Sequence, residues 1–373
     1  MPASAKLLSI ATANAPNVMT QTDVVRVAQA LFRDRFPGMD RMLPVFDTAG
    51  IRTRQSAMPL DWYLTPRSWP ERTQAYLDIA VGMFARAAEA ALDQAGLKGS
   101  DVDVVITVSS TGIATPSLEA RAMARMGFRS DAARVPVFGL GCAGGATGLA
   151  LAGRLAQASP GAVILVVVVE LCTLSFRMED LTKADIVATA LFGDGSAACV
   201  VRCGEAGFAS IEAAGEHTWP GSLDVMGWRV GPTGLGVIFD RAIPPFAREN
   251  LRPAMVGMLE RQGLELEDVD RFICHPGGMK VIDALEGSLS LDQGSLDHER
   301  EVLADHGNMS APTVLYVLDR ARRQGLPNRS VVTALGPGFT LSTVTLRAAA
   351  DAALRRPRPG DRAAARGTGS GRV

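Results

Sequence analysis

Hydrophobic and polar positions in the first third of the chain follow two successive patterns. From Gln74 to Gln94 apolar residues recur at intervals of three and four, which predicts a helix with one buried face, and Gly96 provides a C-terminal stop. The segment from Asp101 to Val108 is rich in β-branched residues and predicts a strand. The chain therefore begins as an alternation of helix and strand, which is typical of an α/β fold.

The same order of elements returns in the second half of the chain. A predicted helix through Met255 and Leu259 stops at Gly263, and 268–275 forms another predicted strand. These positions match those of the first copy at one constant offset, and Gly141-Cys142 aligns with Gly307-Asn308 at nearly the same offset. We interpret the pattern as an internal duplication, with each half an α/β layer around a buried sheet.

The length of the chain agrees with two halves. Its 373 residues exceed the roughly 250 to 300 that one hydrophobic core holds. We place the halves at 1–203 and 204–354. The remaining segment, 355–373, is rich in Arg, Gly and Pro without apolar periodicity, and we predict a disordered tail.

Composition narrows the classes of function. A formal net charge of −1 provides no field that would attract nucleic acid or a membrane surface. The longest apolar run, 162–169, is far shorter than the roughly 20 residues of a membrane span, and its Val and Ile residues favour a buried strand. The five cysteines are odd in number and show no metal-binding spacing, so we expect reduced thiols in the cytoplasm, no metal and no membrane span.

Cys142 is the candidate nucleophile. A short apolar strand, 135–140, leads into the glycine-rich turn 141–145, and a helix of small residues follows from 146 to 155. A thiol at a helix N-terminus has its thiolate stabilised by the helix dipole and free N–H groups, which predicts a lowered pKa. The alternative for Cys142 is a small buried cysteine in a tight turn.

Two further polar residues stand at comparable positions. His275 ends a predicted strand before Pro-Gly-Gly, where an imidazole can act as a base or a hydrogen-bond donor, or can simply be exposed in a loop. Asn308 directly precedes an apolar helix and can also be read as a helix cap. Cys172 follows the longest buried strand, where pockets often form. The other histidines have polar neighbours and are predicted at the surface: His217, His298 and His306.

The duplication suggests that Cys142, His275 and Asn308 belong to one site. Cys142 and Asn308 occupy equivalent helix starts, while His275 ends the strand equivalent to 101–108. A pair of related halves could therefore join all three at one site.

Five segments in order make the sequence resemble the type III polyketide synthases, the chalcone synthase-like branch of the thiolase-fold condensing enzymes. The segments are Gly139-Leu-Gly-Cys142-Ala-Gly-Gly145, Leu191-Phe-Gly-Asp-Gly195, His275-Pro-Gly-Gly278, Gly307-Asn-Met-Ser310 and Leu335-Gly-Pro-Gly-Phe339. The resemblance covers about residues 6–350. It implies a thiolase-like αβαβα arrangement, a homodimer, and CoA thioesters as substrates with no cofactor.

The resemblance also implies roles for the catalytic residues. Cys142 would take a starter acyl group from acyl-CoA or an acyl-carrier protein, with His275 helping to hold the thiolate. His275 and Asn308 would then stabilise the enolate formed from malonyl-CoA on loss of carbon dioxide. The enolate would attack the acyl-Cys142 thioester.

The same resemblance places residues around the substrate. Phe192 matches the family's aromatic gatekeeper, while Val237 replaces a second gatekeeper phenylalanine. The other residues implied at the cavity are Cys172, Ser310, Gly336, Pro337 and Gly338, and those implied for CoA phosphates are Arg52 and Arg54. The run Glu170-Leu-Cys172-Thr is closer to bacterial members that extend long fatty acyl starters to alkylpyrones or alkylresorcinols.

Three other functions remain open at this point. A ketoacyl synthase III-like initiator of fatty-acid synthesis would carry out one condensation and release no ring. A cysteine acyl hydrolase would use the same Cys and His with water. A protein of the same fold that only binds acyl chains would not consume a malonyl thioester at all.

Overall fold

One mixed sheet of nine strands runs through the molecule, in the order β11-β12-β13-β8-β1-β7-β6-β4-β5. It is seen in the computed structural model, which describes residues 4–178 and 181–349. The N-terminal half contributes five strands to this sheet: β1 (Ala5–Asn14), β4 (Val104–Val108), β5 (Ala133–Val137), β6 (Ile164–Leu171) and β7 (Asp194–Cys203). The strands of the second half are β8 (Ala209–Thr218), β11 (Arg271–Cys274), β12 (Arg329–Gly336) and β13 (Thr340–Ala348).

The strand order confirms the duplication. The series β4-β6-β7-β1 in one half corresponds to β11-β12-β13-β8 in the other. In each series the first pair is parallel and the next two pairs are antiparallel. β7 ends at Cys203 and β8 begins at Ala209, so the division proposed at 203 to 204 would fall in the connection between the copies.

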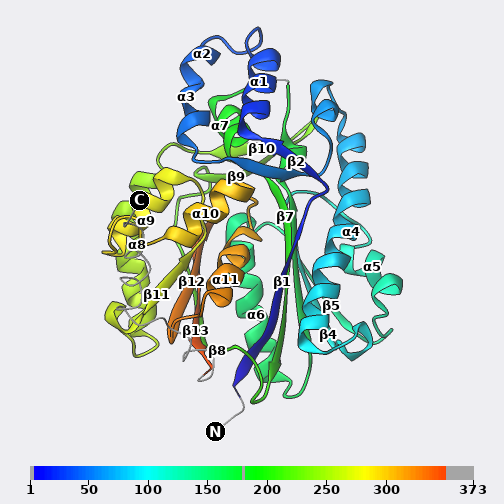
Figure 1. The fold of residues 1–373 in the computed structure, drawn as a ribbon, viewed down its shortest axis with the longest axis vertical. Helices are drawn as coiled ribbons and strands as arrows, with labels where there is room; N and C mark the ends of the chain where they lie inside the picture. The colour runs from blue at the N-terminus through cyan, green and yellow to red at the C-terminus, as the bar shows by residue number, and fades with distance from the viewer. Residues whose placement is uncertain (1–3, 179–180, 350–373) are drawn as a thin grey trace, which may run out of the picture.

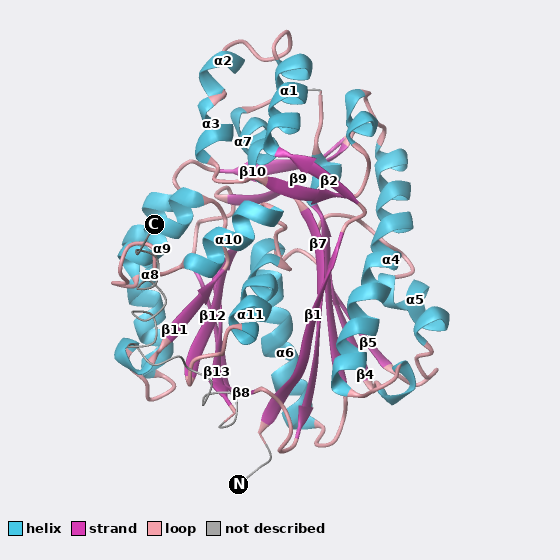
Figure 2. Ribbon diagram, viewed as in Figure 1, coloured by secondary structure: helices cyan, strands magenta, loops and turns pink. Residues whose placement is uncertain are grey.

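The helices form layers on and between the two halves of the sheet (Figure 1, Figure 2). α6 (Gly144–Ala158) and α11 (Thr313–Arg323) lie in the middle and contact strands of both halves. α4 (Trp69–Ala95) and α5 (Leu118–Met126) cover the outer face of one half. α8 (Ile243–Glu260) and α9 (Met279–Ser288) cover the outer face of the other, with α10 (Asp297–His306) beside α11. The chain has the predicted thiolase-like αβαβα fold.

Local sequence explains the two most important elements. In β6 every residue is buried, since the strand has sheet neighbours on both sides and helices over both faces. α4 begins at a capping box between Ser68 and Glu71, and it ends at Gly96 in the left-handed conformation, with φ 67°. The predicted helix and its glycine stop are confirmed.

The small residues of α6 are needed for its central position. A Cβ on Gly145 would lie 2.2 Å from the carbonyl oxygen of Ala311, at the start of the α11 segment. Only a glycine allows the two helix starts to approach this closely. The duplication therefore brings Cys142 and Asn308 together because their helices pack N-terminus to N-terminus.

A smaller set of elements forms a cap over one end of the sheet, at the top of Figure 1. The helices of the cap are α1 (Gln21–Phe32), α2 (Met39–Met42), α3 (Pro44–Thr48) and α7 (Lys183–Leu191). Its strands pair as β2 (Asn17–Thr20) with β3 (Thr53–Ser56), and β9 (Met226–Gly231) with β10 (Gly234–Phe239). The cap covers the strand ends where His275 and Asn308 lie.

Two other expectations concern the C-terminal tail and membrane-spanning helices. The predicted tail, 355–373, lies outside the described residues. Among residues 4–178 and 181–349, no helix combines the length and the apolar character that a bilayer crossing requires.

Candidate active site

Cys142, His275 and Asn308 line one pocket beneath the cap. They come from three distant segments, and the pocket wall between them is largely apolar. The remaining lining residues are Met226, Phe239, Ile243, Gly277, Val281, Leu285, Thr333, Ala334, Leu335 and Leu341. The free volume is only about 20 Å³, room for roughly one water molecule.

Cys142 lies in a 3₁₀ turn, η3 (Gly141–Ala143), that leads directly into α6. Gly141 has a φ of 47°, and a Cβ there would be 2.7 Å from the ring of Pro337. The turn is therefore formed by a residue that tolerates both the left-handed backbone and the close approach. Helix α6 begins at Gly144, earlier than the predicted 146, so Cys142 is at the helix N-terminus as predicted.

The protonation of Cys142 differs from the sequence prediction. Burial raises the pKa of the thiol to about 12, although a hydrogen bond from the Ser310 side chain acts in the opposite direction. The prediction of a lowered pKa is wrong, because the loss of hydration of the buried thiolate outweighs the effect of the helix N-terminus. A thiolate here needs a compensating positive charge.

His275 is the group that could provide that charge. It follows β11, and its main-chain N–H donates to the carbonyl of Thr333 over 2.8 Å. The imidazole is buried, and within the described residues neither ring nitrogen has a hydrogen-bond partner. Burial lowers the pKa of His275 to about 3, so the resting ring is neutral, with one N–H donor and one free acceptor. Proton transfer from Cys142 would create two opposite charges that offset each other's burial penalty.

Asn308 is held in place by main-chain and side-chain hydrogen bonds. Its N–H donates to Leu191 and its carbonyl accepts from Gly193, so it forms a bridge with the segment of Phe192. Its side-chain Nδ2 donates to the carbonyl of Gly277 over 3.1 Å, and Oδ1 accepts from the N–H of Ser310 over 2.8 Å. The alternative of a helix cap does not apply, because α11 starts later, at Thr313.

Ser310 and the Gly336–Gly338 loop support the nucleophile. Ser310 adopts a φ of 59° next to Cys142. A Cβ on Gly336 would be 2.6 Å from the Cβ of Ala143, so the loop packs directly on the nucleophile's turn. The pocket wall itself is formed by Thr333 to Leu335, just before the loop.

The two predicted gatekeepers, Phe192 and Val237, are not among the residues that line the catalytic pocket. The ring of Phe192 packs edge-on against Trp228, with 6.4 Å between centroids. Trp228 is the β9 partner of Val237 in β10, and paired residues of adjacent strands share a face. Val237 is thus next to a large aromatic side chain, while Phe239, two residues further on the same face, reaches the pocket.

Cys172 lies behind the site rather than at the pocket wall. It is completely buried in the turn after β6, and burial raises its pKa, with Glu170, Asp194 and Cys142 adding to the shift. It is not among the residues that line the catalytic pocket. Glu170 is also buried and accepts from Ser110 and Thr111, so it anchors the loop after β4.

The structure adds a second, larger pocket that the sequence did not indicate. It adjoins the catalytic pocket, has a volume of about 420 Å³ and shares Phe239, Gly277 and Val281 with it. Its basic lining residues are Lys183, Arg241 and Lys280. These residues are far apart in sequence, so no local pattern could have assembled them.

The two arginines predicted for CoA contacts are placed differently. Arg54 is completely buried and donates to the carbonyls of Thr189, Ala190 and Phe192, so its guanidinium is not accessible to a phosphate, and that prediction is wrong. Arg52 is exposed and forms an ion pair with Asp305 over 2.6 Å. Its contact with CoA stays a prediction.

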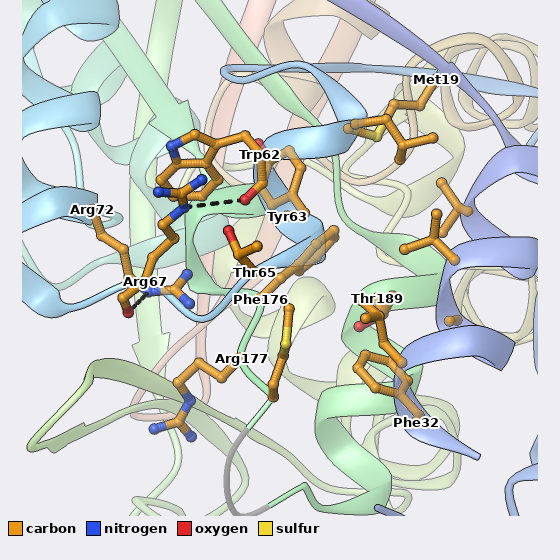
Figure 3. Close-up of a pocket in the computed structure, with 16 residues that line it drawn as sticks. Met19, Phe32, Trp62, Tyr63, Thr65, Arg67, Arg72, Phe176, Arg177 and Thr189 are labelled. Carbon is orange, nitrogen blue, oxygen red and sulfur yellow. Dashed lines mark hydrogen bonds between the residues drawn. The ribbon is translucent and has the colours of Figure 1, made fainter. Parts of the chain in front are cut away.

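A further apolar pocket lies between α1 and the turn η1 (Leu60–Leu64), and Figure 3 shows its lining. Three arginines stand at one end. Arg67 lies over the ring of Trp62, 5.1 Å from its centroid, and Arg72 donates to the carbonyls of Arg67 and Leu174. None of the predicted site residues lines this pocket, and these two arginines connect η1, the start of α4 and the turn after β6.

One histidine predicted at the surface is buried. His298, in α10, is 6% exposed, and burial lowers its pKa to about 4, with the charge of Arg271 contributing. His306 is partly buried and bonds to Gln55 over 2.7 Å. Polar neighbours in sequence therefore do not by themselves indicate that a histidine is exposed.

Comparisons with known proteins agree with this site. Residues 2–205 match the family model for the N-terminal domain of chalcone and stilbene synthases, and residues 210–350 match that for the C-terminal domain. The chain is 38% identical over 349 residues to 1,3,6,8-tetrahydroxynaphthalene synthase of Streptomyces peucetius subsp. caesius, covering 91% of this chain and 92% of that one. It is 31% identical to type III polyketide synthase A of Arabidopsis thaliana, covering 74% and 73%.

A solved structure gives the same result. The crystal structure of 1,3,6,8-tetrahydroxynaphthalene synthase from Streptomyces coelicolor A3(2), a bacterial type III polyketide synthase, superimposes with a TM-score of 0.87 at 29% identity. It covers 92% of this chain and 99% of the other. The family acts on CoA thioesters without a further cofactor. The chain therefore belongs to the chalcone and stilbene synthase family and is an acyltransferase of the type III polyketide synthase class.

Proposed function

We propose that this polyketide synthase extends a long-chain fatty acyl starter with malonyl-CoA and releases an alkylpyrone or alkylresorcinol. The observation that carries the proposal is the meeting of Cys142, His275 and Asn308 in one buried pocket whose other walls are apolar. A hydrocarbon chain suits such walls because it gains hydrophobic free energy and leaves no polar group unpaired.

Loading begins with the neutral pair Cys142 and His275. As the thiol attacks the acyl-CoA carbonyl, its proton passes to the free acceptor nitrogen of His275. The proton then goes to the departing CoA sulfur, so acyl-Cys142, CoA–SH and neutral imidazole result. Burial raises the pKa of Cys142 and lowers that of His275, so both side chains are neutral before the reaction. These shifts support proton transfer during attack on the substrate rather than a permanent thiolate–imidazolium ion pair.

Extension uses the N–H donors of His275 and Asn308. The malonyl carboxylate leaves as carbon dioxide, and its electron pair forms an enolate whose oxygen accepts hydrogen bonds from these two residues. The enolate carbon then attacks the acyl carbonyl and releases the sulfur of Cys142. Asn308 uses one amide N–H for Gly277, so its second N–H remains for this purpose.

The larger pocket is the proposed place for the CoA arm. Its apolar walls suit the pantetheine, and Lys183, Arg241 and Lys280 provide positive charge for phosphates. A volume of about 420 Å³ lies within the range of ligand pockets. CoA and an acyl-carrier protein both present a pantetheine, so either can deliver the starter to this pocket.

The relatives supply a second candidate product. Two of them are named for 1,3,6,8-tetrahydroxynaphthalene, an aromatic compound without an alkyl chain. An enzyme that makes such a product from malonyl units alone would need little space for a starter, and the free volume beside Cys142 is about 20 Å³.

We also propose a homodimer in the cytoplasm. β5 is an edge strand with several exposed residues, and two large apolar side chains next to this edge are exposed: Phe138 at 59% and Ile113 at 50%. A second copy would cover an edge of this kind. The five free thiols favour a reducing compartment.

The test is product analysis with the purified protein. It is incubated with labelled malonyl-CoA alone and with short-, medium- or long-chain acyl-CoA, next to a Cys142→Ala control, and products are identified by mass spectrometry. Alkylpyrones or alkylresorcinols that need the long-chain starter and are absent from the control support the proposal. A tetrahydroxynaphthalene product from malonyl-CoA alone supports the second candidate. A single β-ketoacyl product indicates fatty-acid initiation, and acyl-CoA cleavage without malonyl turnover indicates a hydrolase.

A further inference from the structure

Phe239 lies between the two adjoining pockets. It lines both the catalytic pocket and the larger outer pocket, together with Gly277 and Val281. Gly277 has no side chain and Val281 has a short one, so Phe239 provides the only large side chain among the three shared residues. Its ring therefore has the greatest influence on whether the two spaces are separate or continuous.

The main chain of Phe239 is fixed on both sides. It is the last residue of β10 and pairs with Met226, which itself lines the catalytic pocket. The next residue, Asp240, donates its N–H to the carbonyl of Val225 over 2.9 Å, and its carboxylate accepts from the N–H of Ala242 over 2.7 Å. The backbone cannot move far without breaking these bonds, whereas the half-buried ring can change its rotamer.

Val237 does not occupy the same place. It shares the face of β10 with Phe239, but its cross-strand partner is Trp228, which packs on Phe192. Val237 lines neither the catalytic nor the outer pocket. The gatekeeper position implied by the family resemblance is therefore next to aromatic side chains, and the residue shared by the two pockets lies two positions further along the strand.

We propose that Phe239 is the gate between the outer pocket and Cys142, and that its size selects which acyl groups reach the thiol. With the ring in its present position the space next to Cys142 admits roughly one water molecule, so an acyl chain must displace the ring to enter. The inference deepens the proposed function, because it takes the outer pocket as the place from which the thioester arrives.

The test measures access to Cys142 without any polyketide chemistry. Cys142 is alkylated with iodoacetamide and with an N-dodecyl iodoacetamide, and the labelled peptide is quantified by mass spectrometry in the wild type, Phe239→Ala, Phe239→Trp and Val237→Ala. In Phe239→Ala we expect the rate for the long reagent relative to the short one to rise about tenfold, and in Phe239→Trp to fall. Val237→Ala is the matched control from the same strand face and should keep the wild-type ratio.

Two outcomes would overturn the proposal. One is an unchanged ratio in both Phe239 variants, and the other is a change in Val237→Ala as large as that in Phe239→Ala. Circular dichroism on each variant checks that it is folded. If Phe239→Ala does not fold, Phe239→Leu takes its place, because leucine is smaller than phenylalanine but keeps more of the apolar contact than alanine.

The result is independent of product analysis. A changed reagent ratio in a protein that makes no polyketide leaves the gate in place and removes the proposed function. Polyketide formation with an unchanged reagent ratio in the Phe239 variants would support the proposed function and remove the gate. If both hold, the same variants should change the preferred starter length in the same direction as they change reagent access.

Discussion

The side-chain amide of Asn308 donates a hydrogen bond to the main-chain carbonyl of Gly277, 3.1 Å away, in the loop that directly follows His275. Oδ1 of the same amide accepts from the N–H of Ser310, whose side chain interacts with Cys142. One asparagine thus connects the segments of all three catalytic residues. Its orientation is determined by a donor and an acceptor on opposite sides, which leaves one N–H for the substrate.

Replacing this amide by a carboxylate tests that arrangement. In Asn308→Asp an oxygen faces the Gly277 carbonyl, and no N–H is left for the enolate. We expect release of carbon dioxide from malonyl-CoA to fall roughly 100- to 1,000-fold, the usual loss for one oxyanion donor. Labelled carbon dioxide is the readout.

Acyl loading provides the control for this variant. Loading needs the sulfur of Cys142 and a proton acceptor, so formation of acyl-Cys142 measured by intact mass should remain within about threefold of the wild type. Equal losses of loading and decarboxylation would show that Asn308 acts on the structure of the site rather than on the enolate.

His275 should control the reactivity of Cys142. Burial alone keeps the thiol protonated, with its pKa raised to about 12, and the imidazole is the group in the pocket that can accept the proton. In His275→Ala we expect alkylation of Cys142 by iodoacetamide near neutral pH to slow by about tenfold or more, and the pH profile to move upward. His275→Gln keeps a polar side chain without a base and should behave like the alanine variant. Identical profiles in all three proteins would remove His275 from this role.

The sequence predicted the fold, and it singled out the three polar residues that the structure brings to one pocket, because both follow from repeated or local patterns. The duplication was visible as matched helix and strand positions, and it pointed to Cys142 and Asn308, which the structure brings to one pocket, although α11 begins only at Thr313. The small residues of α6 were also visible in the sequence, but the structural reason for them was not. That reason is the approach of Gly145 to the carbonyl of Ala311, a contact between segments far apart in the chain.

Protonation and the pockets could not be predicted in the same way. The helix N-terminus indicated a lowered thiol pKa, but the pocket's burial depends on side chains from the β9–β10 hairpin, α8, α9 and β12. The outer pocket likewise combines Lys183, Arg241 and Lys280 from separate segments. Distances in space decide desolvation and charge, and a sequence pattern does not contain them.

Arg54 and Arg52 offer a matched pair for the stability of the cap. Arg54 is fully buried and donates to three carbonyl groups, and its charge interacts with the buried carboxyl of Asp194. Burial lowers the pKa of Arg54 and raises that of Asp194, and the attraction between the two charges opposes both shifts. Arg54→Ala removes the guanidinium from the three carbonyls and the positive charge from Asp194, and should lower the free energy of unfolding by about 3 to 5 kcal/mol. Urea unfolding followed by circular dichroism provides the value.

Arg52→Ala is the control, because Arg52 lies two residues before Arg54 and directly precedes β3. Its ion pair with Asp305 is largely exposed, so its loss should cost no more than about 1 kcal/mol. Arg52→Ala also tests the predicted contact between Arg52 and a CoA phosphate. A higher KM for acyl-CoA in Arg52→Ala, with unchanged kcat, would support its contact with a phosphate, and an unchanged KM would argue against it.

His298 should make the protein sensitive to acid. Its folded-state pKa is lowered to about 4, first by burial and then by Arg271, while the unfolded state titrates near 6.5. Below pH 6.5 the unfolded state binds more protons than the folded state, so this contribution to stability is complete above that pH and is lost as the pH falls toward 4. The loss cannot exceed about 1.4 kcal/mol for each pH unit in that window. In His298→Gln, urea unfolding at about pH 7.5 and at about pH 5 should therefore show a smaller difference than in the wild type. A difference as large as that of the wild type would assign the acid sensitivity to other groups, of which His275, with its pKa lowered to about 3, is the first to test by the same substitution.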